Sequence, residues 1–83
     1  MNEVIKAMYT SSLNAAKRLN AQYKKELTDA IHGTGLCKGI SSTERINICV
    51  SLRSAIMNTQ AEIDMLTADL AAMERKENCN DLH

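Results

Sequence analysis

The placement of glycine constrains the fold of this chain more than any other sequence feature. All three glycines lie in the segment 33–39, and proline is absent. The long stretches on either side therefore lack the two residues that interrupt helices most strongly. Phe and Trp are also absent, and Ala, Leu, Ile and Met dominate the apolar residues, as in helical bundles. We therefore predict a helix, a loop and a second helix.

Local signals predict where each helix begins and ends. The first helix is expected over about 3–32, because Gly33 can take the left-handed conformation that commonly ends a helix. The second helix is expected over about 42–76, because Ser41 and Glu44 have the spacing of a capping box at a helix start.

The other segments complete the predicted organisation. Residues 33–41 form the loop, and residues 1–77 form a single helical-hairpin domain, since a chain this short builds one core at most. The segment 78–83 is polar, contains poor helix formers and lies at the end of the sequence. We expect it to be a disordered tail.

Each predicted helix carries an apolar seam in which residues recur at alternating spacings of three and four, the pattern of helices that pack lengthwise. The loop is long enough for the seams to face each other, which predicts an all-α fold of two long antiparallel helices in a coiled-coil-like hairpin. Asn20 is a polar residue at an inward position, where such residues often fix register or oligomeric state. The seam of the first helix is Ile5, Tyr9, Leu13, Ala16, Asn20, Tyr23, Leu27 and Ala30, flanked by Met8, Leu19 and Ile31. The seam of the second helix is Cys49, Leu52, Ile56, Thr59, Ile63, Leu66, Leu70 and Met73.

The second helix carries a further stripe of apolar and small residues that the first helix cannot cover. The stripe follows helical periodicity on a face away from the seam and consists of Ile46, Val50, Met57, Ala61 and Ala68. Exposed apolar strips of this kind usually mark a contact surface, and the expected occupant is the same stripe of a second copy. The hairpin would then dimerise into a four-helix bundle. The alternative is a set of scattered surface residues without a partner.

The charges cancel overall but are unevenly distributed. Ten basic and ten acidic residues give no net charge, so the total predicts neither a nucleic-acid binder nor an acidic mimic of one. The first helix is net positive and the second is net negative. In an antiparallel hairpin a basic band gathers toward the loop, made of Lys17, Arg18, Lys24, Lys25, Lys38, Arg45 and Arg53. Carboxylates gather toward the termini, namely Glu62, Asp64, Asp69, Glu74 and Glu77.

The basic band is a candidate contact for an acidic protein face or for a phosphate backbone. The alternative is a solvated face of helix-favouring residues. The lack of exposed aromatic residues for base stacking further weakens the nucleic-acid interpretation.

The sequence offers little material for catalysis. His32 lies at a helix end and His83 at the last position, where neither can join a nucleophile and an orienting acid in a triad. The segment 33–39 lacks the Lys-Ser/Thr ending and the preceding strand of a phosphate-binding loop. We expect no enzyme activity, no catalytic residues, no cofactor and no small-molecule substrate.

The cysteines predict neither a disulfide framework nor a metal site. Cys37, Cys49 and Cys79 are odd in number and match no compact disulfide pattern. We expect Cys49 to behave as a small buried apolar residue and Cys37 as an exposed loop thiol. The possible metal-ligand pairs are His32 with Cys37 and Cys79 with His83. These pairs lie near opposite ends of a hairpin, and two ligands do not make a structural zinc site.

The first residues lack the apolar core of a signal peptide, and the longest apolar run is far shorter than the roughly 18 residues that cross a bilayer. We expect a cytoplasmic protein without membrane contact.

These features predict a small non-enzymatic protein-protein interaction module, an adaptor or inhibitor, that binds through helix faces as a homodimer. An RNA- or DNA-binding regulator that uses the basic band is the first alternative. The outline also resembles many unrelated two-helix hairpins, including plasmid copy-control RNA binders, secretion-system co-chaperones and small phage-encoded inhibitors of host protein complexes, and no motif selects one of them. The second alternative is a co-chaperone or inhibitor that stays monomeric and partly molten until a larger target completes its core.

Overall fold

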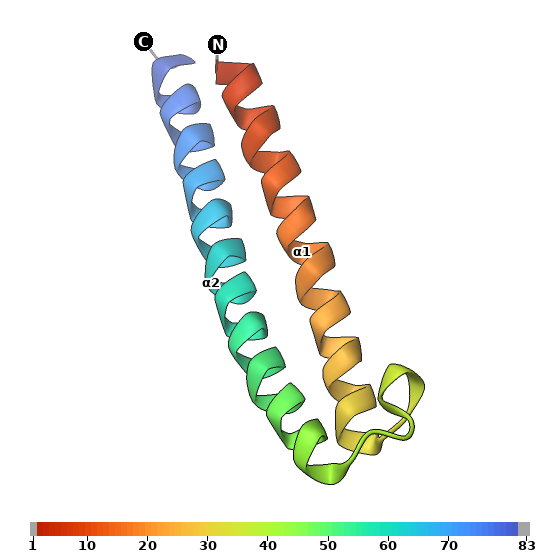
Figure 1. Ribbon diagram of the computed structural model, residues 1–83. Helices are drawn as coiled ribbons and strands as arrows, with labels where there is room; N and C mark the ends of the chain where they lie inside the picture. Colours follow the sequence, from red (N-terminus) through yellow and green to blue (C-terminus); the bar gives the residue numbers. More distant parts are fainter. Residues whose placement is uncertain (1, 82–83) are drawn as a thin grey trace.

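A computed structural model describes the backbone of residues 2–81 and the side chains of residues 3–76. It contains helix α1 over Asn2–His32, a short 3-10 turn η1 over Gly35–Cys37 and helix α2 over Ser42–Asp81. The two long helices pack against each other as an antiparallel hairpin, with the loop at one end and both termini at the other (Figure 1). The hairpin measures 63 × 16 × 15 Å, and residues 2–81 form no strand. The predicted all-α hairpin is confirmed.

Gly33 ends α1 as predicted. Its backbone φ angle is 67°, in the left-handed region that glycine adopts without steric strain. The amide of Thr34 then donates a hydrogen bond of 3.0 Å to the carbonyl oxygen of Asp29, which satisfies one of the free carbonyls at the helix end. The chain therefore leaves the helix axis at the residue where the sequence predicts the turn.

Helix α2 begins at the predicted cap and extends past the predicted end. The hydroxyl oxygen of Ser41 accepts a hydrogen bond of 3.3 Å from the amide of Glu44, which is one half of a capping box. The helix ends at Asp81 and not near Lys76, so it includes the first part of the expected tail. No Gly or Pro interrupts this part of the chain, and poor helix formers other than these cost less than about 1 kcal/mol each. Residues 82–83 of the expected tail lie outside the described residues.

The predicted seams face each other along most of the hairpin. All seam residues of α2 and those of α1 from Tyr9 onward are buried or half-buried, whereas the flanking Met8, Leu19 and Ile31 are exposed. The most buried side chains are Leu13, Ala16, Asn20, Ala30, Cys37, Leu52, Thr59 and Leu66. The seam prediction is confirmed from Tyr9 to Met73.

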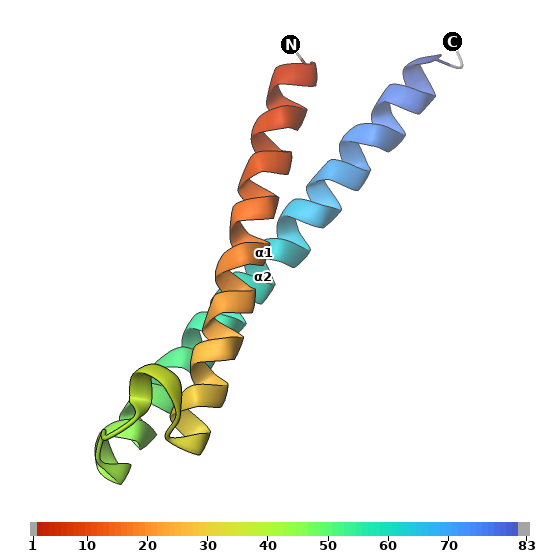
Figure 2. The ribbon, with the colours of Figure 1, turned by 90° about the vertical axis from the view of Figure 1, so that its right-hand side faces the viewer.

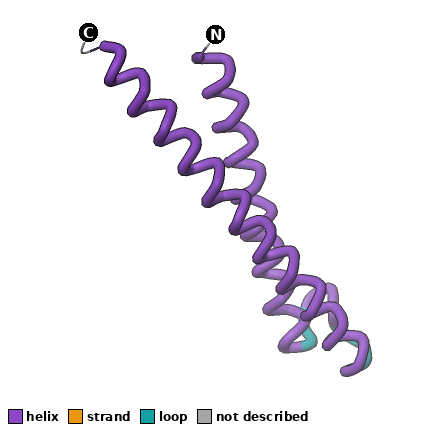
Figure 3. The backbone as a smooth tube through the Cα atoms, turned by 90° about the vertical axis from the view of Figure 1, so that its left-hand side faces the viewer, coloured by secondary structure: helices purple, strands orange, loops and turns teal. Residues whose placement is uncertain are grey.

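Ile5 departs from the seam prediction, because its side chain is 41% exposed. The helices cross and then diverge toward the termini, as Figure 2 and Figure 3 show from opposite sides. Helix α2 is therefore too distant to cover the first turns of α1. Residue spacing predicts which face of a helix is inward, but the crossing angle depends on how the two surfaces interdigitate.

Candidate interaction surfaces

The α2 stripe, defined as Ile46, Val50, Met57, Ala61 and Ala68, is exposed along its whole length. Ile46 is 64%, Val50 61% and Met57 72% exposed, whereas Leu52 in the seam of the same helix is 8% exposed. The spacing of the stripe residues places them on one face of α2, away from the seam that α1 covers. The hairpin leaves this apolar face in water.

Met65 extends the stripe and was missed by sequence reasoning. Its side chain is 57% exposed. Met65 follows Ala61 by four residues and precedes Ala68 by three, so it lies beside both on the helix surface. Helical spacing is the signal that would have found it.

Most of the predicted basic band is exposed, namely Lys17, Arg18, Lys24, Lys25, Lys38 and Arg53. Arg53 of α2 joins the basic residues of α1 in the same half of the hairpin because the helices are antiparallel (Figure 1). These side chains are available to a partner.

Arg45 differs from the other residues of the band because it is half-buried and bonded within the hairpin. Its Nη1 atom donates to the carbonyl oxygens of Ala30 and Ile31, at 3.3 Å each. A Cβ atom on Gly33 would lie 3.0 Å from the same nitrogen. The guanidinium therefore caps the end of α1, where the helix dipole favours a positive charge. We leave Arg45 out of the surface that a partner could use.

A pocket of about 300 Å³ lies at the loop end of the hairpin, and sequence reasoning missed it. This loop-end pocket is lined by residues of α1, the loop and α2, namely Glu26, Asp29, Leu36, Cys37, Ile40, Ile48 and Leu52. Leu36 is 85% exposed and lines the pocket together with the half-buried Ile40 and Ile48. The sequence signal for the pocket was a leucine, Leu36, in a glycine-rich loop. The pocket itself is formed by α1, the loop and α2 together, so no local sequence pattern predicts it.

Cys37 is buried, with 7% of its surface exposed, so the prediction of an exposed loop thiol is wrong. The η1 turn folds the loop back onto the helices, and the Cys37 amide donates a hydrogen bond of 3.0 Å to the Thr34 carbonyl oxygen. The Cys37 side chain packs in one cluster with Ala30 and Leu52, and the half-buried Cys49 packs against that cluster. Both thiols are free.

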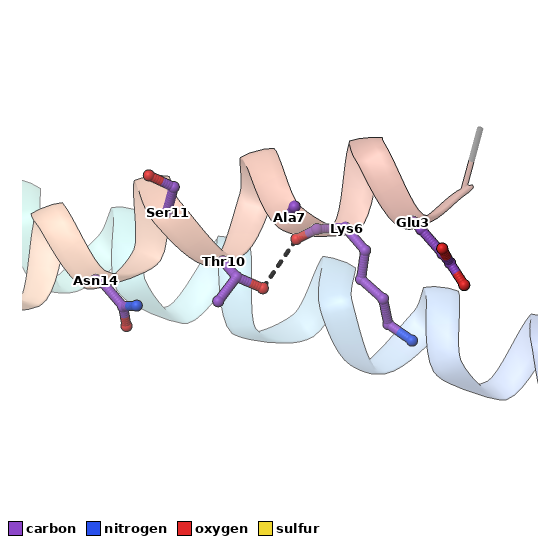
Figure 4. Close-up of a pocket in the computed structure, with 6 residues that line it drawn as sticks. All are labelled: Glu3, Lys6, Ala7, Thr10, Ser11 and Asn14. Carbon is purple, nitrogen blue, oxygen red and sulfur yellow. Dashed lines mark hydrogen bonds between the residues drawn. The ribbon is translucent and has the colours of Figure 1, made fainter.

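A second hollow runs along the first turns of α1 (Figure 4). It is lined by Glu3, Lys6, Ala7, Thr10, Ser11 and Asn14. All of these residues come from one helix, and the Thr10 hydroxyl donates back to the Lys6 carbonyl oxygen at 2.8 Å. A catalytic site needs polar groups that converge from different elements, and this hollow has none.

Within the described side chains, no three His, Cys, Asp or Glu residues are grouped so that they could hold a metal ion. Two other possible ligands, Cys79 and His83, are not among the residues whose side chains are described. Neither α1 nor α2, over the residues described, has an apolar stretch long enough to cross a membrane.

Comparison of the chain with protein-family models, with curated proteins and with solved structures found no match.

Proposed function

We propose that this chain is a small non-enzymatic protein-protein interaction module that acts as a homodimer through the α2 stripe. The observation that carries the proposal is the exposure of Ile46, Val50 and Met57 on a face that α1 does not cover. Large apolar side chains gathered on one face are unfavourable in water and are typical of contact surfaces.

The extent of the exposed surface supports a second copy as the occupant. The hairpin exposes 6210 Å², whereas a compact monomer of 9.2 kDa would expose about 4,900 Å². Its radius of gyration is 18.2 Å, against about 12 Å for a compact domain of 83 residues. The excess area of about 1,300 Å² is more than the roughly 800 Å² that each partner buries in a typical stable interface. A second hairpin laid along the first would bury an area of this size.

The charge distribution supports an antiparallel arrangement of the two copies. Arg53 lies toward the loop end of α2, whereas Glu62, Asp64, Asp69 and Glu74 lie toward the termini. In an antiparallel pair the loop half of one copy lies against the terminal half of the other, so that opposite charges meet. Met57 lies midway between Ile46 and Ala68, and a two-fold axis there would align the two stripes. The resulting assembly is an antiparallel four-helix bundle.

Light scattering coupled to size exclusion tests the homodimer, with reduced protein measured over a range of concentrations. The wild-type mass is expected near twice the 9.2 kDa of one chain. The double variant Val50→Glu, Met57→Glu is expected to be monomeric and still helical, because both side chains are exposed in the hairpin. The matched control is Ser51→Glu, Asn58→Glu, which adds the same charge at exposed positions one residue further along. It is expected to stay dimeric.

A double variant that remains dimeric would show that the stripe is not the interface. A wild-type monomer at every concentration would rule out the homodimer and leave the stripe for a different protein, as in a co-chaperone or an inhibitor. Such a chain would melt without a sharp transition when alone and gain one only with its target.

An RNA- or DNA-binding regulator is the second candidate, supported by the exposure of Lys17, Arg18, Lys24, Lys25 and Arg53 in one half of the hairpin. Neutralising phosphates releases counterions, so the affinity for nucleic acid would fall steeply with salt. Fluorescence anisotropy with mixed-sequence RNA and DNA at low salt measures this. Lys24→Glu, Lys25→Glu should abolish binding, and the control Arg75→Glu, Lys76→Glu should retain most of it. Absence of binding at low salt would exclude this candidate.

A further inference from the structure

The loop-end pocket has an apolar floor that no described side chain covers. Ile40, Ile48 and Leu52 line it from the loop and from α2, and they are half-buried or buried. Leu36 stands at its edge with 85% of its surface in water. An aliphatic side chain entering the pocket from outside would remove both the floor and Leu36 from water, which is favourable.

The rim of the same pocket is acidic. Glu26 and Asp29 of α1 line it, and both also line an adjoining hollow with Gln22, Lys25, Gly35 and Leu36. The hydrogen-bond partners that the described side chains offer these carboxylates are uncharged: the amide of Gln22 donates to Glu26 at 3.1 Å, and the hydroxyl of Thr34 donates to Asp29 at 3.2 Å. Lys25 lines the adjoining hollow, but no described cation is bonded to either carboxylate, so both can accept from a basic group of a partner.

The position of these carboxylates on α1 strengthens their effect. Asp29 lies in the last turn of the helix, where the helix dipole already places partial negative charge, and Glu26 lies about one turn earlier. Helix stability alone favours cations in the last turn, so Asp29 is an unfavourable choice for the helix itself. The guanidinium of Arg45 neutralises the carbonyls of Ala30 and Ile31, not these side chains.

We propose that the loop-end pocket is a docking site for a segment of another protein in which an aliphatic side chain stands next to Lys or Arg. The aliphatic group packs against Leu36, Ile40 and Ile48, and the basic group reaches Glu26 and Asp29. The pocket is lined by different residues from the α2 stripe, so this site does not depend on the homodimer. A dimer formed through the stripes would present two such sites.

Selection from a display library of random twelve-residue peptides, on immobilised reduced protein, tests the proposal and requires no identified partner. The enriched peptides are expected to pair Leu, Ile or Val with Lys or Arg. Synthetic versions of these peptides are then measured by fluorescence anisotropy. Enrichment of acidic peptides, or no enrichment above uncoated support, would overturn the proposal.

Matched variants locate the bound peptide. Glu26→Gln removes one charge of the rim and is expected to weaken binding about tenfold, whereas Glu62→Gln removes an exposed charge elsewhere and should have no effect. Leu36→Ser is expected to weaken binding about tenfold or more, whereas Val4→Ser, at the other end of the hairpin, should not. Asp29 is left unchanged because it also holds the loop through Thr34. Wild-type affinity in both Glu26→Gln and Leu36→Ser would place the peptide elsewhere and refute the site.

The outcome is distinguishable from failure of the proposed homodimer. Leu36→Ser is expected to leave the solution mass unchanged, and Val50→Glu, Met57→Glu is expected to leave peptide binding unchanged. Peptides that lose affinity only in the Val50→Glu, Met57→Glu variant would bind the α2 stripe and would argue against the loop-end site.

Discussion

The side-chain amide of Asn20 donates a hydrogen bond of 2.9 Å to the hydroxyl oxygen of Thr59, linking the middle of α1 to the middle of α2. The same nitrogen lies 3.2 Å from the carbonyl oxygen of Ile56, and the Thr59 hydroxyl donates within α2 to the carbonyl oxygen of Ala55 at 2.9 Å. Asn20 is 5% and Thr59 8% exposed. Sliding one helix along the other would leave these groups unpaired in the seam, so the pair stabilises a single register.

Replacing Asn20 with Ala should therefore lower the free energy of unfolding by about 1–2 kcal/mol, since a buried hydrogen bond is lost and a small cavity remains. Urea denaturation followed by circular dichroism, at one fixed protein concentration, measures the change. The control is Asn14→Ala on the same helix, where the side chain is exposed and the expected change is within about 0.5 kcal/mol. Equal stability of the two variants would show that the Asn20 amide contributes nothing to the fold.

Replacing Arg45 with Ala should destabilise the loop end of the hairpin. The variant loses two hydrogen bonds from a charged donor to the carbonyls of Ala30 and Ile31, which are worth about 1–2 kcal/mol together because both are long. The same denaturation experiment on Arg53→Ala is the control, because Arg53 is exposed. If Arg53→Ala is as destabilising as Arg45→Ala, the loss of stability in Arg45→Ala does not come from losing the cap on α1.

Substitutions at two glycines of the loop distinguish the cost of backbone strain from the cost of steric crowding. Gly35 and Gly39 have φ angles of 57° and 84°, so an Ala side chain at either costs about 1–2 kcal/mol. A Cβ atom on Gly35 would also lie 2.6 Å from Oδ2 of Asp29, whereas one on Gly39 meets nothing within 4 Å. Gly35→Ala is therefore expected to destabilise the protein by about 1 kcal/mol more than Gly39→Ala, because the Asp29 carboxylate must leave its bond to Thr34. Equal thermal midpoints of the two variants would contradict this arrangement of Asp29.

The proposed homodimer predicts a melting temperature that rises with protein concentration. Folding and association are linked by mass action when two chains bury a surface that only the folded state presents. Differential scanning calorimetry over a hundredfold range of concentration measures the shift, and the variant Val50→Glu, Met57→Glu is the control that should show none. A wild-type melting temperature independent of concentration would argue against a dimer that forms together with the fold.

The residues that the sequence identified correctly are those whose roles are local. Gly33 was recognised as a helix end and Ser41 as a cap because each acts on backbone groups only a few residues away. The α2 stripe was found for the same reason, since helical spacing alone places Ile46, Val50 and Met57 on one face. Whether a second copy covers that face depends on another molecule.

Two of the errors arose where a residue's environment depends on distant parts of the chain. Ile5 has the spacing of a seam residue, but its side chain is 41% exposed. The helices diverge toward the termini, and Ile5 belongs to the first turns of α1 (Figure 2). Cys37 lies in a loop, and loop residues are usually exposed. The η1 turn instead packs its side chain against Ala30 and Leu52, which belong to two different helices.

Helix number, helix faces and the local caps at Gly33 and Ser41 follow from the order of the amino acids, because hydrogen bonding and side-chain spacing within a helix act over a few residues. Three features depend on the packing of α1 against α2: the crossing of the helices, the use of Arg45 as a cap and the pocket beside Leu36. Each feature joins residues that are far apart along the chain and meet only after the hairpin closes. The distances between such residues in space cannot be read from a pattern along the sequence.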